Sequence, residues 1–419
     1  MIDVFIGIDL GSTTTKAVVL DGDGQVIGRG ITNSRSNYDV AAHMVREEAF
    51  VRTRFTLVER ETGAAAVEEL ERNFKLHQYL DQLDLLGEAM SMIAGGPKHA
   101  AHAGELKARL AAIGNEMAAR ARQHFARGAS RRSDFFRDLA AADFMQLAEA
   151  IAEPKGITFD VLCSVFDAAI LSVEALPVDN AFERHVDAAL DETSGDARLR
   201  AAVESARSVE LRTRSTVGTG YGRQRLPFPK EQIRSEILCH GLGAHAMFPA
   251  TRTVLDIGGQ DTKAIQLDAE GLVTSFQMND RCAAGCGRYL GYIADEMNLA
   301  VHELGPLAQR SRQRVKINST CTVFAGAELR ERLSLGQKRE DIVAGLHRAI
   351  VIRAMSLLAR SGGVSDQFTF TGGVARNPAA VSAIEELVRE NYGQRTLNIS
   401  SDSIYTGALG AALFARRAA

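Results

Sequence analysis

Two short stretches of the chain decide its fold: DLGSTTTK at residues 9–16 and DIGGQDTK at residues 256–263. Each begins with an aspartate at the end of an apolar run and continues through glycines into hydroxyl or amide side chains. Glycine lets backbone N–H groups approach phosphate oxygens closely. Hydroxyl groups donate further hydrogen bonds to the same oxygens. The two stretches therefore predict a pair of phosphate-binding loops.

The sequence around the two loops has the same order of elements. Residues 4–20 are expected to form a strand, the first loop and a second strand, and the acidic turn DGDG at 21–24 leads into a third strand, QVIGRGI. From residue 253 the pattern repeats as TVLDIGGQDTKAIQL, the acidic turn DAEG, and LVTSFQM. Such an internal repeat predicts a duplicated α/β fold in which each half begins with an antiparallel meander.

These loops supply candidate ligands for a nucleotide and its metal ion. The carboxylates of Asp9 and Asp256 suit a hydrated Mg²⁺, which prefers oxygen ligands, and Lys16 can offset phosphate charge. A third loop, FTGGVARN at 370–377, follows a predicted strand, and its bare glycines leave room for a purine or ribose. The predicted nucleotide-binding residues are Asp9, Gly11, Ser12, Thr13, Thr14, Lys16, Asp256, Gly258, Gly259, Gln260, Asp261, Gly372, Gly373 and Val374.

The sequence between the two meanders has a different character. From about residue 40 to 205 it is rich in Ala, Glu, Arg and Leu, and apolar residues such as Leu106, Leu110, Ile113 and Met117 fall at helical spacing. We therefore expect a mostly helical insertion in the first lobe. The expected boundaries are 1–39 and 206–252 for the first lobe, 40–205 for the insertion, and 253–419 for the second lobe.

Charge and hydropathy exclude several classes of partner. The 49 basic and 52 acidic residues leave a net charge of -3, so no basic field favours nucleic acid. The first residues contain Asp3 and Asp9 and resemble a strand rather than a signal peptide. The sequence contains no apolar run of about 18 residues, so it predicts no membrane-spanning helix. We therefore expect a cytoplasmic protein with no membrane partner.

The chain has five cysteines, an odd number that does not favour a disulfide framework. Cys163 and Cys239 are expected to be small buried apolar groups. Cys282 and Cys321 each precede a predicted helix, whose N-terminus favours a thiolate or a negatively charged cluster. Iron–sulfur clusters usually take four thiolates, so two cysteines would fill half of the ligand positions. The role of Cys286 stays open between a buried apolar group and a further ligand.

Eight motifs, in order along the chain, resemble those of the benzoyl-CoA reductase ATPase subunits and 2-hydroxyacyl-CoA dehydratase activators. This family belongs to the actin/Hsp70/hexokinase superfamily of ribonuclease H-like ATPases, in which two similar lobes close on ATP. The motifs are IGIDLGSTTTKAVV, GTGYGR, ILCHGLGA, DIGGQDTK, FQMNDRCAAG, STCTVFA, TGGVARN and TGALGAALFA.

The resemblance implies a function. In this family ATP hydrolysis drives a low-potential electron from ferredoxin through a [4Fe–4S] cluster that bridges two related subunits, each giving two cysteines. Carried over to this sequence, the ligands are Cys282 and Cys321. The family usually has a small residue other than cysteine at the position of Cys286, which leaves a third-ligand role open.

The length of the chain, its insertion and the stretch GRGITNSRSNYDVA resemble the larger, or alpha, ATPase subunit of ATP-dependent benzoyl-CoA reductase. That resemblance implies a shorter paralogous ATPase subunit and two further catalytic subunits that bind benzoyl-CoA and reduce its ring. One alternative is a homodimeric activator of a 2-hydroxyacyl-CoA dehydratase. Another, from a different class, is a sugar kinase or chaperone-like ATPase without redox chemistry.

Two glutamates are candidates for positioning the attacking water. Glu236 lies in SEILCHGLGA, and Glu328 follows Cys321 by seven residues on a predicted helix. A carboxylate of this kind can orient or deprotonate water near the γ-phosphate. An ordinary structural glutamate is the competing interpretation at both positions.

Overall fold

The apolar run ahead of the first phosphate loop forms the centre of a four-stranded sheet. Strand β1 pairs with β2 in antiparallel register, which places Asp9 opposite Lys16. Strand β3 continues the meander, and β4 joins the other side of β1 in parallel. In spatial order the strands of this first sheet are β3 (Val26–Asn33), β2 (Thr14–Leu20), β1 (Ile2–Leu10) and β4 (Leu211–Gly220).

The second meander repeats this arrangement, so the predicted duplicated α/β fold is confirmed. Strand β5 pairs antiparallel with β6, which places Asp256 opposite Lys263, and β8 joins β5 in parallel. Every residue of β5 is buried, as expected for a central strand covered on both faces. In spatial order this second sheet is β7 (Val273–Asn279), β6 (Thr262–Leu267), β5 (Thr253–Ile257), β8 (Gln367–Thr371) and β9 (Thr396–Asn398).

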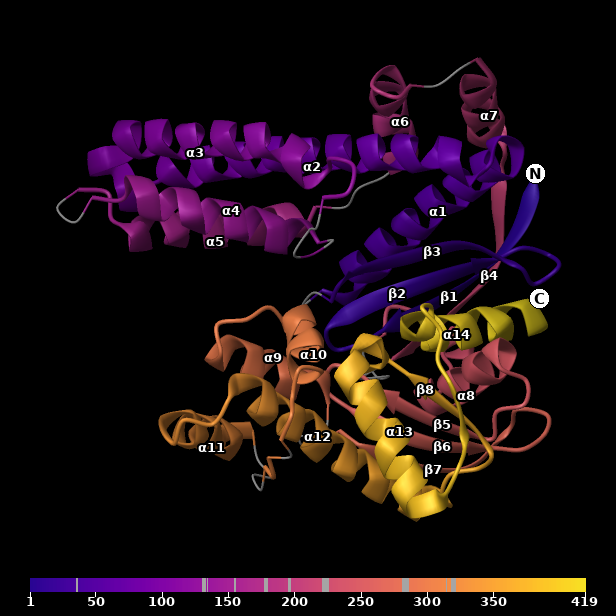
Figure 1. The fold of residues 1–419 in the computed structure, drawn as a ribbon. Coiled ribbons are helices and arrows are strands. Elements are labelled where there is room, and N and C mark those ends of the chain that lie inside the picture. Colours follow the sequence, from indigo (N-terminus) through magenta and orange to yellow (C-terminus); the bar gives the residue numbers. More distant parts are fainter. Residues whose placement is uncertain are drawn as a thin grey trace. The chain divides into compact units, whose positions relative to one another are not determined.

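The computed structural model describes residues 1–34, 37–129, 133, 135–153, 156–176, 180–194, 197–220, 226–280, 286–313, 315–317 and 322–419. The chain divides into two units (Figure 1). Residues 2–34 and 211–419 form the two-sheet unit, and residues 35–210 form the helical unit. The insertion was expected at 40–205, within the range of the helical unit.

Two helices of the two-sheet unit, α8 and α14, are exchanged between the sheets: each follows one sheet in the chain but packs on the other. Helix α8, which follows β4 of the first sheet, packs on β6 and β7 of the second, whereas α14, late in the chain, packs on β1 and β4 of the first. The two helices also pack against each other. The α-helices of this unit are α8 (Glu236–Met247), α9 (Gly287–Glu296), α10 (Val301–Ala308), α11 (Thr322–Ser334), α12 (Arg339–Ser361), α13 (Pro378–Tyr392) and α14 (Thr406–Arg417).

Small residues permit the close approach of α14 to both of its neighbours. A Cβ atom added at Gly410 would lie 1.8 Å from the carbonyl oxygen of Cys239 on α8. A Cβ atom added at Gly7 of β1 would lie 2.0 Å from the carbonyl oxygen of Ala408 on α14. Backbone therefore meets backbone on two sides of α14, and neither glycine can be enlarged without moving the helix.

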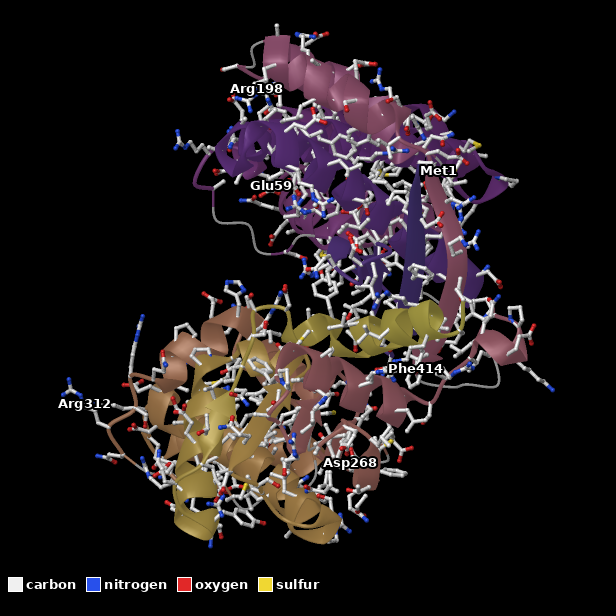
Figure 2. The ribbon with its side chains drawn as sticks, turned by 90° about the vertical axis from the view of Figure 1, so that its right-hand side faces the viewer. Met1, Glu59, Arg198, Asp268, Arg312 and Phe414 are labelled. Carbon is white, nitrogen blue, oxygen red and sulfur yellow. The ribbon has the colours of Figure 1, made fainter. Side chains whose placement is uncertain are left out.

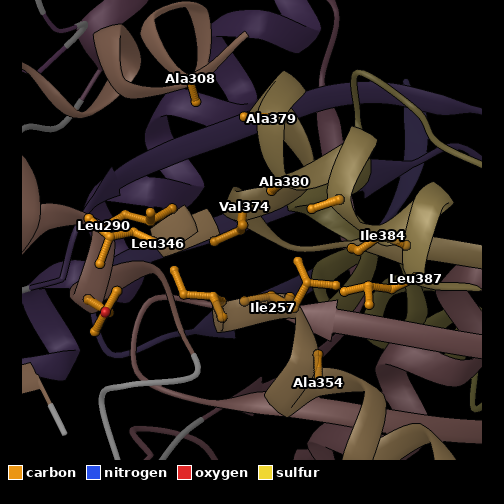
Figure 3. Packing of buried hydrophobic residues seen from close by; sticks show 14 of the residues in the cluster. Ile257, Leu290, Ala308, Leu346, Ala354, Val374, Ala379, Ala380, Ile384 and Leu387 are labelled. Carbon is orange, nitrogen blue, oxygen red and sulfur yellow. The ribbon is translucent and has the colours of Figure 1, made fainter. Parts of the chain in front are cut away.

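The largest apolar core lies between the second sheet and the helices α9 to α13 (Figure 3). It contains Ile257 from the end of β5, Val374 from the third loop, and Ile384 and Leu387 from one face of α13. The predicted adenosine loop is therefore anchored in a rigid core. Helix α12 passes through the same core. Among the described residues it is the one helix long and apolar enough to cross a membrane, and 61% of its most apolar stretch is buried inside the protein.

The described residues of the helical unit form apolar clusters of their own, and the 31-residue helix α2 contributes to two of them. Asn37 caps the first helix with its side chain, and Gly63, at a φ of 88°, separates α1 from α2. Glu59 on α1 and Arg198 on α7, labelled in Figure 2, mark two helices that pack together. The α-helices are α1 (Tyr38–Thr62), α2 (Ala64–Ala94), α3 (Ala103–His124), α4 (Phe136–Ile151), α5 (Phe159–Glu174), α6 (Ala181–Asp191) and α7 (Ala197–Ser208).

Candidate nucleotide and metal site

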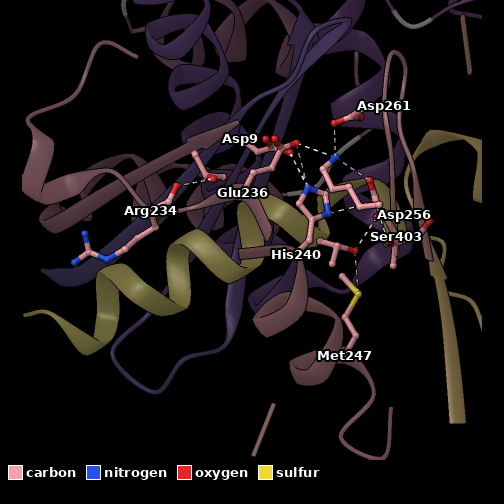
Figure 4. A network of polar contacts seen from close by, with 12 residues as sticks. Asp9, Arg234, Glu236, His240, Met247, Asp256, Asp261 and Ser403 are labelled. Carbon is pink, nitrogen blue, oxygen red and sulfur yellow. Dashed lines mark hydrogen bonds and ion pairs between the residues drawn. The ribbon is translucent and has the colours of Figure 1, made fainter. Parts of the chain in front are cut away.

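The two strand-end aspartates lie on either side of one histidine (Figure 4). Asp9 and Asp256 are the penultimate residues of β1 and β5, and both are almost fully buried. His240, one turn into α8, places Nδ1 at 3.2 Å from Asp256 Oδ2 and Nε2 at 3.9 Å from Asp9 Oδ2. Because α8 follows the first sheet but packs on the second, its imidazole connects the carboxylates of the two sheets.

A buried lysine sits in the same cluster. The ammonium of Lys263, on β6, lies 2.7 Å from Asp261 Oδ2, 2.9 Å from Glu236 Oε1 and 3.4 Å from Asp256 Oδ1. Glu236 comes from the first turn of α8, and its Oε1 is 3.9 Å from His240 Nε2. The carboxylate cluster, defined as Asp9, Glu236, His240, Asp256, Asp261 and Lys263, thus combines four acidic and two basic side chains.

Burial and charge act against each other throughout this cluster. Burial would raise the pKa of Asp256, but His240 and Lys263 outweigh it and lower that pKa. Burial would lower the pKa of His240, yet Asp256 raises it above its ordinary value, which favours the imidazolium. The pKa of Lys263 is raised well above normal because three carboxylates outweigh burial. Burial also raises the pKa of Glu236, and Lys263 only partly opposes this effect.

The cluster has the features required to hold a divalent cation. Asp9 Oδ1 is buried and has no hydrogen-bond partner among the described residues, so it has a free acceptor. Ligand atoms of Asp9, Glu236 and His240 lie within 4.8 Å of one another. Two of these three side chains are carboxylates, and oxygen ligands favour Mg²⁺ over softer metals.

The two predicted phosphate loops touch each other. A Cβ atom added at Gly259 would lie 2.2 Å from Thr13 Oγ1 and 3.7 Å from Ser12 Oγ. Gly11 accepts a hydrogen bond from Ser34 and lies close to the ammonium of Lys16, which is 3.2 Å from the position of a Cβ on that glycine. The structure thus brings together the loops predicted from DLGSTTTK and DIGGQDTK.

The third loop packs directly on the second. Gly372 has a φ of 86°, and a Cβ atom there would lie 2.3 Å from the carbonyl oxygen of Ile257. Thr371 Oγ1 donates a 2.8 Å hydrogen bond to Asp256 Oδ2. A Cβ atom at Gly373 would meet no described atom within 4 Å, so the loop borders open space at this glycine. The three loops together therefore surround the ends of β1, β5 and β8.

Residues 6–415 match the BadF/BadG/BcrA/BcrD ATPase family. The chain belongs to this family. The match extends over both sheets and over the helical unit. The predicted ATPase superfamily is thereby confirmed.

Similar proteins refine this assignment. The chain is 42% identical over 228 residues to the (R)-2-hydroxyglutaryl-CoA dehydratase activating ATPase of Acidaminococcus fermentans, covering 54% of this chain and 85% of that protein. It is 31% identical over 175 residues to one of the benzoyl-CoA reductase subunits of Thauera aromatica, covering 42% and 62%. The 2-hydroxyisocaproyl-CoA dehydratase activator of Clostridium difficile, solved with bound ADPNP, has the same fold, with a TM-score of 0.54, 23% identity, and coverage of 99% and 95%.

These comparisons modify the expectation drawn from length and insertion. Membership of the ATPase family is shown, but the specific likeness to the larger benzoyl-CoA reductase subunit receives only distant support. The dehydratase activator, the alternative interpretation of the sequence, fits the similarities better.

The cysteine predictions can be followed only in part. Cys282 and Cys321 both lie outside the described residues. Helix α9 begins shortly after the first of them, with the buried Cys286 at its N-cap, and α11 begins directly after the second. Cys239 is buried as expected, and burial raises the pKa of its thiol to about 12. Cys163 is only partly buried.

Backbone hydrogen bonds connect α9 to the second phosphate loop. The amide of Gly287 donates to the carbonyl of Gly258 over 2.8 Å, and the amide of Arg288 donates to that of Gly259 over 2.7 Å. The first turn of α9 is therefore held by the loop itself, so movement of one displaces the other.

Sequence reasoning identified Glu236 but missed two of its neighbours. His240 follows Glu236 by one helical turn in EILCHG, and Lys263 ends DIGGQDTK as Lys16 ends DLGSTTTK. Both signals were present in the sequence, although burial could not be inferred from them. The other candidate, Glu328, is paired with Arg332 on its own helix over 2.7 Å.

Proposed function

We propose that this chain is the ATP-hydrolysing, electron-activating component of a two-component acyl-CoA enzyme. The observation that carries the proposal is the pair of strand-end aspartates on either side of His240, with an unpaired acceptor oxygen on Asp9 beside two contacting glycine loops. The likeness to an activating ATPase supports it.

Within this proposal each part of the site has one task. Ser12, Thr13 and Lys16 bind the phosphates, and Gly258 and Gly259 of the second loop border them. The loop at Gly372, Gly373 and Val374 borders the adenosine. Asp9 and Asp256 hold Mg²⁺, which would neutralise phosphate charge and orient the nucleotide.

Glu236 is the proposed residue that orients the attacking water. It lies in the carboxylate cluster, beside His240 and Lys263, and its side chain is 12% exposed. A partly accessible carboxylate next to the metal site is well placed to accept a proton from water. Glu328 remains a second candidate from the sequence.

Cys282 and Cys321 are the proposed ligands of half of a [4Fe–4S] cluster completed by a related subunit, and the cluster would carry one electron at a time from ferredoxin. Helices α9 and α11 follow these cysteines. The bonds from Gly287 and Arg288 to the second phosphate loop would transmit the state of the nucleotide to α9.

The electron acceptor we propose is a 2-hydroxyacyl-CoA dehydratase, in keeping with the more similar relatives. A benzoyl-CoA reductase, with a shorter paralogous ATPase subunit and two benzoyl-CoA-binding subunits, is the second candidate. It is favoured by the helical unit, since the activator matched over 85% of its own length matches only 54% of this chain.

Anaerobically purified protein tests the proposal in two steps. Wild-type protein should hydrolyse Mg-ATP, and Asp9→Asn should lower the rate by about a hundredfold or more while the circular dichroism spectrum stays unchanged. Reduced wild-type protein should then activate a 2-hydroxyacyl-CoA dehydratase only when ATP is present. Full ATPase activity in Asp9→Asn contradicts the site, and ATP-dependent reduction of benzoyl-CoA by co-purified subunits favours the second candidate.

A further inference from the structure

The duplicated meanders carry a duplicated lysine. Lys16 stands opposite Asp9 in the β1–β2 register, and Lys263 stands opposite Asp256 in the β5–β6 register. Directly opposed residues of antiparallel strands project from the same face of the sheet. Both lysines therefore start from the same position relative to a strand-end aspartate, one in each half of the fold.

The two lysines nevertheless have different environments. Lys16 is only half-buried, and its ammonium lies over Gly11 of the first phosphate loop. It has no carboxylate partner among the residues that the structure describes. Lys263 is 1% exposed and contacts three carboxylates. An ammonium has three N–H donors, so the contacts of Lys263 leave none for a phosphate.

The contact between Lys263 and Glu236 joins the two halves of the duplicated fold. Lys263 belongs to β6 of the second sheet, whereas its partner Glu236 begins α8, which follows β4 of the first. The other basic side chain of the carboxylate cluster, His240, lies 3.9 Å from Glu236, beyond hydrogen-bond distance. The Glu236 side chain is only 12% exposed. Without Lys263, no hydrogen-bond donor of the carboxylate cluster would fix the direction of its carboxylate. An uncompensated buried charge destabilises the folded protein, so the carboxylate would turn toward solvent.

We propose that Lys263 is a positioning residue for Glu236, holding that carboxylate in place for its action on water, while the duplicated Lys16 binds phosphate. This inference rests on the proposed function. The duplication supplied two equivalent lysines, and the structure assigns them different tasks. In this role Lys263 acts on the attacking water through Glu236.

A double-mutant cycle on the full chain, measured as steady-state Mg-ATP hydrolysis, tests this proposal. Lys263→Met keeps most of the side-chain volume and removes the charge. It should lower kcat tenfold or more and leave the Kd for ADP within about threefold of wild type. Glu236→Gln should lower kcat about a hundredfold. The double variant should be no slower than Glu236→Gln, since residues that act as a unit are not additive.

Lys16→Met is the matched control. It should raise the Kd for ADP tenfold or more, and combining it with Glu236→Gln should multiply the two losses in kcat/KM. Multiplicative losses for Lys263→Met with Glu236→Gln would overturn the inference, as would a loss of ADP affinity in Lys263→Met with kcat unchanged. Absence of ATP hydrolysis by wild-type protein would instead refute the proposed function itself.

Whether each variant folds also tests the pairing of Lys263 with Glu236. If Lys263→Met alone does not fold, the double variant decides, because it removes both members of the buried pair. A folded double variant with the rate of Glu236→Gln supports the pairing. A double variant that also fails to fold overturns it, since Lys263 would then serve Asp256 and Asp261 rather than Glu236.

Discussion

The contact between the exchanged helices gives a sharp stability prediction. In Gly410→Ala, the new Cβ would lie 1.8 Å from the carbonyl oxygen of Cys239 and 2.6 Å from its carbon. An unstrained contact between carbon and oxygen needs about 3.3 Å. Helix α14 must therefore move by roughly 1.5 Å away from α8, by the difference between these distances.

The other side of α14 does not allow that movement freely. The carbonyl of Ala408 already lies 2.0 Å from the position of a Cβ on Gly7, so the helix rests on the backbone of β1. Overpacking of a close-packed core costs about 1–3 kcal/mol, and a helix confined on two sides belongs at the upper end, ~3 kcal/mol. A loss of that size lowers the ratio of folded to unfolded protein by about a hundredfold.

Urea titration measures this loss. The chain contains no tryptophan, so unfolding is followed by circular dichroism and, for the two-sheet unit alone, by release of a fluorescent ADP analogue. Gly291→Ala on α9 is the control, because a Cβ there meets nothing within 4 Å and alanine is the better helix former by roughly 1 kcal/mol. Equal urea midpoints for Gly410→Ala and wild type would refute the packing argument.

Three further outcomes are expected. Gly373→Val should weaken ADP binding more than tenfold with little loss of stability, because its side chain would occupy the open space beside the adenosine loop; unchanged affinity by calorimetry would make the loop a simple turn. Cys282→Ala and Cys321→Ala should each abolish the cluster absorbance of anaerobically assembled protein, whereas Cys286→Ala should retain it; an intact spectrum in Cys321→Ala contradicts the ligand assignment. Replacing residues 35–210 by a linker of at least about ten residues should preserve ATP hydrolysis. A shorter linker would not reach, because β3 ends and β4 begins at opposite ends of the first sheet, roughly 30 Å apart. Inactivity with every linker length would show that the helical unit is required for catalysis.

The duplicated meander could be predicted from sequence because its signals are local. An apolar run, glycines and an acidic turn recur in the same order in DLGSTTTK and DIGGQDTK, and strands of this kind pair with their sequence neighbours. The helical character of residues 35–210 was likewise visible in the spacing of Leu106, Leu110 and Ile113, all of which are buried.

What the sequence could not show depends on contacts between distant segments. Lys16 and Lys263 end motifs of the same pattern, but only the second motif has Asp261, which contacts its lysine, where the first motif has a threonine. The contact of Lys263 with Glu236 depends on tertiary packing. The same holds for the two glutamates. Glu236 and Glu328 both lie on helices, but one joins the carboxylate cluster and the other pairs with an arginine on its own helix.

The packing of α14 on the first sheet also affects the order in which the protein folds during synthesis. Strand β1 precedes α14, the helix that covers it, by roughly 400 residues of chain. At a synthesis rate of about 5–20 residues per second, the face of the first sheet that α14 covers stays exposed for roughly 20–80 seconds. The first lobe therefore cannot complete its folding until α14 has been synthesised, and its apolar face stays uncovered until then.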